Sequence, residues 1–520
     1  MVAITVNSLS AFCDTKTCNK FVGVSVAAIS SLLALHANAA EWKFTPIVNL
    51  TESYSDNIKL APKETAQSAF VSQVSPGLTV AATGQRLKLQ ASYVIDNSFY
   101  SGSDYESKTN HRLNANATAA LIEELFFLDG SANISQQNLS PFGTVTDNNI
   151  NISNNRVQVK TYKVSPYFRH KINNDVTGEL RYSRDSVSSD STLSRDSEGD
   201  NLRFSINSGS AFKTLSWGLL YNHQDVHYER QSPLKTNMST VSLAYALSAM
   251  FKLTGTGGYE DNNYRYQGAQ AAGYFGTLGF VWTPTERTNI TFNSGQRFYG
   301  KTHALSINQR ARMSIWSLGY SEDVTTTRAQ FLVPATISTS NFLNQLWKTS
   351  IPDPALRQQT VDSFIRDSAL PSSLSQPINT FSNQVFLQKS LQASVALTGI
   401  KNTAVLSIFN SSREALSSLD GNGATLPGPA GDVRQSGVNA LWNIQLSPRT
   451  NLSASAAYTK SNQINSGVKD NTTALRASIS RQLQPKLRAM LEARHQHKNS
   501  NFALGNYDEN AISFYLFLGF

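Results

Sequence analysis

The sequence is poor in cysteine, in charge and in long apolar runs. It contains two cysteines, Cys13 and Cys18, and both lie near the N-terminus of a chain of 520 residues. Charged residues make up 16% of the chain, and no run reaches the 18 or so apolar residues that a membrane-spanning helix needs. Disorder is also excluded, because a disordered chain has a larger share of charged residues than this one, and fewer aromatic residues than the 10% found here.

The N-terminus has the order of a secretory signal. Lys16 and Lys20 precede an apolar run over residues 21–35, and small residues follow up to Ala40. The run is too short to serve comfortably as a membrane anchor. We therefore expect residues 1–40 to be a signal peptide that is cleaved near Ala39 or Ala40. Both cysteines would leave with it, which excludes disulfides, cysteine-bound metals and c-type haem attachment in residues 41–520.

Residues 41–520 show apolar and polar residues in strict alternation over segments of about ten residues. In residues 86–96 one face carries Leu87, Leu89, Ala91, Tyr93 and Ile95, and the other carries Arg86, Lys88, Gln90, Ser92 and Asp96. Residues 451–459 and 486–498 repeat the pattern. A period of two is that of a strand, and one apolar face per strand is typical of barrels in outer membranes.

Short connections alternate with long polar ones along the chain. Short turns are expected near 83–85, 122–124, 173–175 and 484–485, and long loops over 136–155, 187–200, 225–235, 261–270 and 462–470. Barrels of the outer membrane have short periplasmic turns and long extracellular loops. The sequence thus predicts an all-β fold with one domain over residues 41–520, a transmembrane antiparallel β-barrel of about 22 strands (20–24).

One predicted connection, residues 329–381, is exceptional because it is some fifty residues long and lacks strand alternation. Phe342, Leu346 and Trp347 have helical spacing, and Asp353-Pro354 is a suitable start for a second amphipathic helix. Such helices must bury their apolar faces. The loop can do so inside the lumen, where it would narrow the pore, or on the outer rim, and both interpretations stay open.

The last ten residues, AISFYLFLGF, place apolar side chains at every second position. A buried strand of a soluble protein is one explanation, but such an apolar strand at a free end is prone to aggregate unless one face meets lipid. A last strand that ends in Phe is also the signal by which bacterial assembly machinery recognises outer-membrane barrels. We assign this assembly signal to Phe514, Leu516, Leu518 and Phe520.

Basic residues recur on the polar face that we expect to line the lumen. They are Arg86, Lys88, Arg181, Arg203, Arg476, Lys486, Arg488 and Arg494. Rows of fixed charge in a confined aqueous path set solute preference, so one interpretation is a lumen tuned to anions. The alternative is a salt-bridged wall that stiffens the barrel, with Asp96, Glu179 and Glu492 as partners.

Catalytic patterns are scarce in this sequence. There is no Gly-x-Ser-x-Gly elbow, and the glycine-rich stretches lack the lysine of a phosphate loop. His223 and His227 share a strand face, as do His495 and His497, but isolated pairs of this kind are more often solvated than metal-bound. No basic cluster with interleaved aromatics indicates nucleic acid. We predict no enzyme, no cofactor and no metal site.

Three stretches together resemble a known family. Residues 54–60 (YSDNIKL), 70–77 (FVSQVSPG) and 317–328 (SLGYSEDVTTTR) are similar to the outer-membrane β-barrel family associated with PEP-CTERM/exosortase exopolysaccharide clusters, within a broader β-barrel porin group. The resemblance implies a place in the outer membrane of a Gram-negative bacterium and a link to exopolysaccharide production or export. It supplies no reaction and no binding residues.

The sequence thus favours an outer-membrane channel, or porin-like conduit, for hydrophilic solutes, including anionic ones. The first alternative is a structural or adhesive barrel that presents its loops around a closed lumen, and the second is a membrane-embedded hydrolase. The expected partners are outer-membrane lipid and lipopolysaccharide, the barrel-assembly machinery, and exopolysaccharide or its export components.

Overall fold

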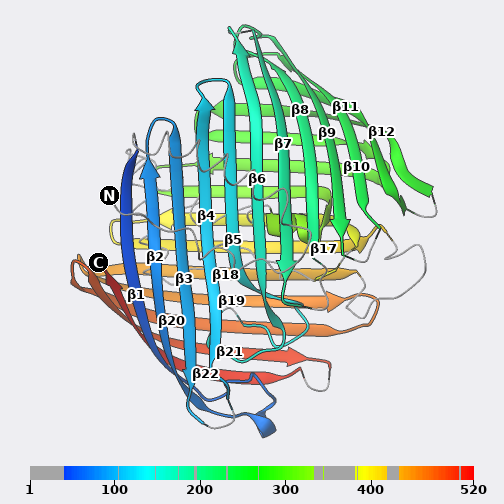
Figure 1. Cartoon of the computed structure of the whole chain (residues 1–520). Helices are drawn as coiled ribbons and strands as arrows, with labels where there is room; N and C mark the ends of the chain where they lie inside the picture. Colours follow the sequence, from blue (N-terminus) through cyan, green and yellow to red (C-terminus); the bar gives the residue numbers. More distant parts are fainter. Residues whose placement is uncertain are drawn as a thin grey trace.

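The computed structural model describes residues 40–332, 344 and 381–520, apart from gaps at 103–104, 147, 174, 192–195, 230–231, 267–268, 383, 418–431 and 503–504. These residues form one antiparallel sheet of 22 strands (Figure 1). The strands are β1 (Glu41–Ser55), β2 (Ala69–Thr83), β3 (Leu87–Tyr100), β4 (Lys108–Ile122), β5 (Phe126–Asn138), β6 (Arg156–Ile172), β7 (Val176–Ser189), β8 (Ser197–Ser208), β9 (Leu215–Tyr228), β10 (Leu234–Ala246), β11 (Phe251–Tyr266), β12 (Ala269–Thr285), β13 (Thr288–Arg297), β14 (Gly300–Arg310), β15 (Ser314–Thr326), β16 (Val385–Thr398), β17 (Asn402–Ala415), β18 (Val433–Ser447), β19 (Thr450–Gln463), β20 (Lys469–Gln484), β21 (Leu487–Ser500) and β22 (Tyr507–Gly519). Two short helices, η3 (Lys63–Thr65) and α2 (Thr327–Leu332), lie between strands.

The sheet closes on itself because β1 pairs with β22 as well as with β2. At this junction the Ser53 hydroxyl donates to the Ser513 hydroxyl at 2.8 Å, and the Phe520 amide donates to the Pro46 carbonyl at 3.1 Å. Closure leaves no strand edge unpaired, which is what a sheet surrounded by lipid requires. The predicted all-β barrel and its count of about 22 strands are confirmed.

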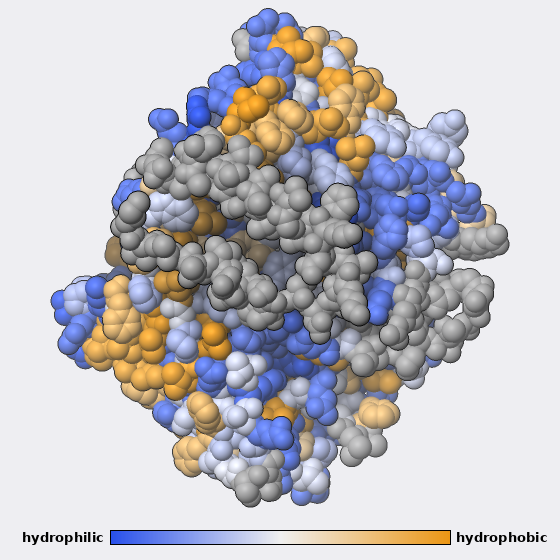
Figure 2. All heavy atoms as spheres, in the orientation of Figure 1, coloured by the Kyte–Doolittle hydropathy of each residue, from blue (hydrophilic) through white to orange (hydrophobic). Residues whose placement is uncertain are grey.

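The two faces of the wall differ as the alternation predicts. On β22, Ile512 and Phe514 are about half exposed on the outside, whereas Glu509 and Ser513 are buried on the inside. The other strands repeat this, with exposed Leu219, Leu243, Trp316 and Leu491 outside and buried Ser183, Ser407 and Ser478 inside. Figure 2 shows hydrophobic side chains gathered in broad areas of the visible face, with hydrophilic ones around them. The exterior is therefore apolar, and the lumen is lined with polar side chains.

The two ends of the barrel carry different connections. We call the end at which β1 starts and β22 stops the turn end, and the opposite one the loop end; the N and C marks lie close together at the turn end in Figure 1. Turn-end connections are short, as predicted. At the loop end the predicted loops were too long in several places: residues 225–228 and 261–266 continue β9 and β11. The alternation fades there because beyond the bilayer both faces can be polar, yet the backbone stays paired.

Within the described residues, no helix is both long and apolar enough to cross a bilayer. The signal peptide predicted over residues 1–40 lies outside the described residues except for Ala40. Most of the predicted 329–381 connection also lies outside them, including both amphipathic helices. Its described parts are the end of α2, Asn344 and Phe381.

Candidate functional site: the lumen and its inward segments

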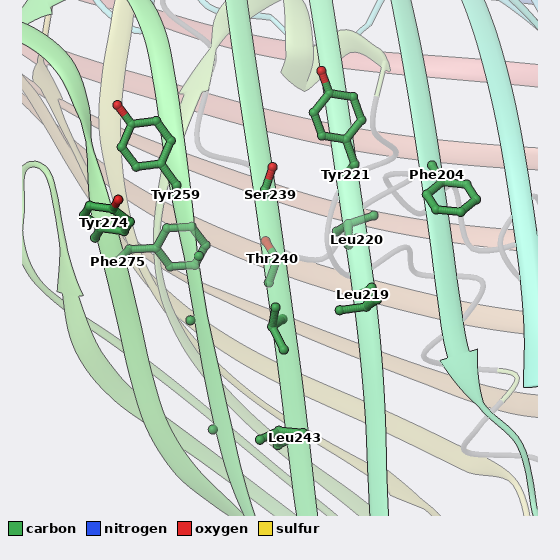
Figure 3. A pocket seen from close by; sticks show the side chains of 14 residues that line it. Phe204, Leu219, Leu220, Tyr221, Ser239, Thr240, Leu243, Tyr259, Tyr274 and Phe275 are labelled. Atoms are coloured by element: carbon green, nitrogen blue, oxygen red, sulfur yellow. The ribbon is translucent and has the colours of Figure 1, made fainter.

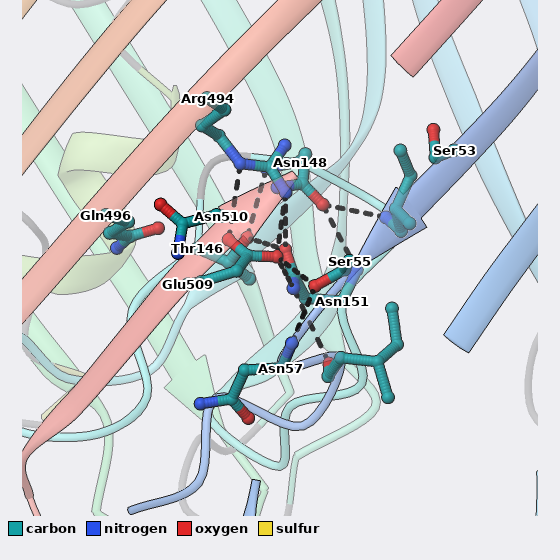
Figure 4. A network of polar contacts seen from close by, with 12 residues as sticks. Ser53, Ser55, Asn57, Thr146, Asn148, Asn151, Arg494, Gln496, Glu509 and Asn510 are labelled. Atoms are coloured by element: carbon teal, nitrogen blue, oxygen red, sulfur yellow. Dashed lines mark hydrogen bonds and ion pairs between the residues drawn. The ribbon is translucent and has the colours of Figure 1, made fainter. Parts of the chain in front are cut away.

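The connection between β5 and β6, residues 139–155, folds into the lumen. Its Asn151 amide donates to Glu509 Oε1 of β22 at 2.6 Å, and the same oxygen accepts from Ser55 of β1 at 2.8 Å and from Arg494 of β21 at 2.9 Å (Figure 4). Glu509 is fully buried and Asn151 nearly so. One carboxylate thus connects this segment, which we call the inner loop, to the three strands β1, β21 and β22.

Further contacts fix the inner loop along its length. Gln496 and the Tyr507 hydroxyl both donate to the Val145 carbonyl at 2.8 Å. Lys498 is fully buried, donates to the Gly143 carbonyl at 2.5 Å, and pairs with Asp470 at 2.6 Å. A buried charge that is paired and hydrogen-bonded is stable, whereas loss of either partner is costly. The inner loop is therefore a fixed part of the lumen.

An apolar contact adds to these hydrogen bonds. Ile150 packs with Ile58, Ala69 and Val71 in a buried cluster. The Ile152 amide also donates to the Ile58 carbonyl at 3.0 Å. The connection between β1 and β2 therefore packs against the inner loop. The two loop-end connections share one buried apolar cluster inside the lumen.

Helix α2 begins the long connection after β15 and reaches two parts of the wall. On one side the Arg328 guanidinium pairs with Asp185 of β7 and donates to the Ser197 hydroxyl of β8 at 2.9 Å. On the other side, Gln330 is hydrogen-bonded to Gln388 of β16 and to Arg413 of β17. The strands β7–β8 and β16–β17 are far apart in the order of the sheet. The helix is therefore a crossbar inside the lumen.

Phe381, four residues before β16, lies against the crossbar. The Phe381 ring lies 5.0 Å from the Phe331 ring, and the Phe381 amide donates to the Leu139 carbonyl at 2.9 Å. Both phenylalanines pack on Val159 and Val187, which are buried on the inner face of β6 and β7. The two ends of the long connection thus meet inside the lumen; whether the rest of the loop occupies the lumen or the outer rim depends on residues outside the described part of the chain.

The predicted lumenal charges fall into three groups. Arg181, Arg476 and Arg494 lie in the lumen and pair with acids: Arg181 with Asp129 and Glu179, Arg476 with Glu492, and Arg494 with Glu509. Lys88, Arg203 and Arg488 lie on the inner face, and Arg488 donates to Gln482 at 3.1 Å. Arg86 and Lys486 lie in turns beyond the strands, and Arg86 pairs with Glu123.

The surroundings of these cations differ along the barrel. In the middle of the lumen the wall is salt-bridged, and Tyr167 also stacks on Arg181, with the guanidinium 3.7 Å from the ring centre. The residues that sequence reasoning missed are Asn151, Arg328, Asp185, Lys498 and Glu509, because nothing in their local pattern reveals contacts between distant parts of the chain.

No metal centre emerges from the described residues, among which no group of three or more His, Cys, Asp or Glu side chains lies close enough to hold an ion. The histidine pairs face outward: His497 contacts Asp508 at 2.6 Å, and His223 contacts Asn237 at 2.6 Å. These contacts are local pairs between neighbouring strands. They do not converge on the lumen.

A groove of about 680 Å³ lies on the outer face of β9–β12 (Figure 3). Its floor is formed where Gly255 and Gly257 lack side chains, and Leu219, Val241 and Tyr274 are among its walls. Tyr274 is 87% exposed on the outside of the wall. The groove therefore belongs to the apolar exterior and has no part in the lumen.

No family model and no curated protein matches this chain. Among solved structures, the FrpB iron transporter from Neisseria meningitidis (F5-1 variant) is similar at a TM-score of 0.51 and 10% identity, over 94% of this chain and 84% of that chain. Its F3-3 variant gives a TM-score of 0.50 at 10% identity, over 92% and 81%. A mutant of the ferric enterobactin receptor PfeA from Pseudomonas aeruginosa gives 0.48 at 10% identity, over 92% and 80%.

At such low identity the likeness is one of fold alone. The fold is a closed antiparallel barrel of 22 strands, of the type found in the outer membrane of Gram-negative bacteria. In barrels of that type the short turns face the periplasm and the long loops face the exterior.

Proposed function

We propose that the protein is a loop-gated conduit through the outer membrane for hydrophilic solutes, and that it serves exopolysaccharide production or export. The observation that carries the proposal is a polar lumen crossed by two anchored segments, the inner loop and α2. Inward-folded segments narrow a wide barrel and determine what passes, since fixed polar groups then lie close to the solute. The link to exopolysaccharide is supported by the resemblance of residues 317–328 and the two N-terminal stretches.

The proposal gives no side chain a catalytic role, and the fold neighbours are named as transporters and receptors. The competing function is a barrel whose lumen stays closed and whose loops act at the cell surface. The inner loop and α2 are compatible with closure if nothing displaces them. Conductance separates the two functions.

The test is single-channel recording of the mature protein, residues 41–520, in a planar bilayer. A matched variant replaces residues 333–380 by a short Gly-Ser linker, which is feasible because Phe331 and Phe381 already lie side by side. We expect the natural protein to conduct, and the variant to conduct more if the long connection occupies the lumen. If neither protein conducts although both are folded, the closed, loop-presenting barrel replaces the conduit.

A further inference from the structure

The turn end of the lumen carries a set of basic side chains on its inner face. Each lies within three residues of the turn-end limit of its strand. The set, which we call the basic ring, consists of Lys43 (β1), Lys88 (β3), Lys171 (β6), Lys252 (β11), Arg310 (β14) and Arg488 (β21). The six strands lie at intervals around the barrel, with the widest gap between β14 and β21, so the charges face the mouth from several sides.

Strand register places the basic ring on the inner face, because alternate residues of a strand share a face. Lys88 is in phase with the buried lumenal Asp96, and Lys252 is in phase with Glu260. Arg488 pairs across the ladder with Gln482, in phase with the buried Ser478 and Ser480. Lys171 is in phase with Tyr167 of the same strand, and the Tyr167 ring stacks on Arg181 inside the lumen.

The two remaining members follow from the same argument. Lys43 pairs with Ala81, which is in phase with the buried Gln73 and Ser75 of β2. Arg310 is in phase with the buried Thr302 of β14 and pairs with the buried Ile315. The neighbours of opposite phase, such as Phe44 and Leu253, are exposed on the apolar outside.

Basic side chains outnumber acidic ones at this mouth. Among inward positions within three residues of the turn end, the acidic residues are Glu41, Asp129 and Glu179; Asp129 pairs with Arg181, and Glu179 pairs with Arg169 and Arg181. Lys43, Lys88, Lys171 and Lys252 are all exposed and form no ion pair in the described part of the chain. Farther into the lumen, Arg476 pairs with Glu492 and Arg494 pairs with Glu509. Like charges around a wet opening focus the field and raise the local concentration of counter-ions.

We propose that the basic ring captures an anionic polysaccharide, one that bears carboxylate, sulfate or phosphate groups, at the periplasmic mouth of the barrel. This inference rests on the proposed conduit and adds the class of solute and the side from which it enters. A flexible polymer with repeated charges can engage several ring residues at once, so weak single contacts add to a useful affinity. The inward direction of the side chains favours a solute in the pore over a lipid headgroup outside it.

The turn end also supplies a matched control. Lys213, Arg287, Arg312, Lys401, Arg449 and Lys486 lie in the turns themselves and carry the same total charge as the basic ring. An acidic periplasmic protein or anionic lipid would meet these turn residues first. Replacing one set or the other with glutamine therefore removes equal charge at the same end, from the lumen or from the rim.

The experiment measures binding of a fluorescent polygalacturonate oligomer to the full mature barrel in detergent, by anisotropy, so that it does not depend on conductance. Replacing all six ring residues with Gln should weaken binding about tenfold or more at low salt, because focused charge changes association by at least that factor. The turn variant should lose less than about threefold, since its charges face open solvent. A neutral dextran of equal length should not bind.

Failure has distinct forms. If the ring variant binds as tightly as the natural protein, or if dextran binds equally, the capture site is refuted. An equal loss in the turn variant also refutes it and assigns the attraction to the rim, as for a protein or lipid partner. A smaller variant, with only Lys43, Lys88 and Arg488 changed, keeps the test valid should the full set disturb folding. A barrel that binds polygalacturonate but never conducts would overturn the conduit and leave the capture site standing.

Discussion

The buried pair of Arg494 and Glu509 gives the sharpest test of how the inner loop is held. Their side chains are 3% and 0% exposed, with 2.9 Å between Arg494 Nη2 and Glu509 Oε1. Glu509→Ala removes the acceptor of the Ser55, Asn151 and Arg494 donors and leaves a buried guanidinium without its anion. Removing one partner of such a pair costs about 3–5 kcal/mol. We expect the free energy of unfolding to fall by that amount.

The assay is guanidinium unfolding in lipid vesicles, followed by tryptophan emission. Glu52→Ala is the control, because Glu52 is also on a strand at the β1–β22 junction but is exposed and accepts one hydrogen bond, from Ser72. It should cost about 0.5 kcal/mol or less. The double variant Arg494→Met/Glu509→Leu should cost less than the sum of the single changes, since no charge is left buried. Equal losses for Glu509→Ala and Glu52→Ala would refute the reasoning.

Two further predictions concern α2 and the C-terminus. Arg328→Gln leaves Asp185 buried without its cation, at a cost of about 3 kcal/mol, and should make the channel current noisier. The control is Lys389→Gln, which breaks a more exposed pair with Glu414 and should leave the current noise unchanged. Equal noise in the two variants would count against the crossbar. Deleting Phe520, which is 60% exposed, should lower the heat-modifiable barrel in outer-membrane fractions several-fold while refolding in detergent is unchanged. Ile400→Ala, at a turn residue that is 98% exposed, is the control, and equal assembly of both variants would contradict the signal assigned to the last strand.

The sequence was sufficient for the barrel because alternation is local. The face that carries Leu87 and Leu89 could be separated from the face that carries Lys88 and Asp96 without any knowledge of neighbouring strands. The same local method failed at strand ends. Arg86 and Lys486 continue the alternation by one residue past the strand, so they were assigned to the lumen although they lie in turns.

The site itself could be predicted only in part. Lys88 and Arg488 of the basic ring were found from their strand faces. The contact between Asn151 and Glu509 joins residues that are 358 positions apart, and only the closure of the sheet brings them together. The partners that neutralise Arg181 and Arg476 are set by register between strands, which alternation alone does not fix. The strand face on which a charged side chain lies was therefore predictable from the sequence, whereas the residue of opposite charge that pairs with it was not.

The crossbar has a consequence for the cell that would carry this barrel. A cylinder of 22 strands standing open would let harmful molecules leak through the membrane that is meant to exclude them. Each 1.4 kcal/mol that favours the state in which α2 crosses the lumen reduces the fraction of barrels without this crossing about tenfold. Contacts worth about 3 kcal/mol therefore keep that open fraction near one per cent. If the barrel is the conduit proposed above, Arg328 and Gln330 set the resting permeability of the envelope, independently of what the barrel transports.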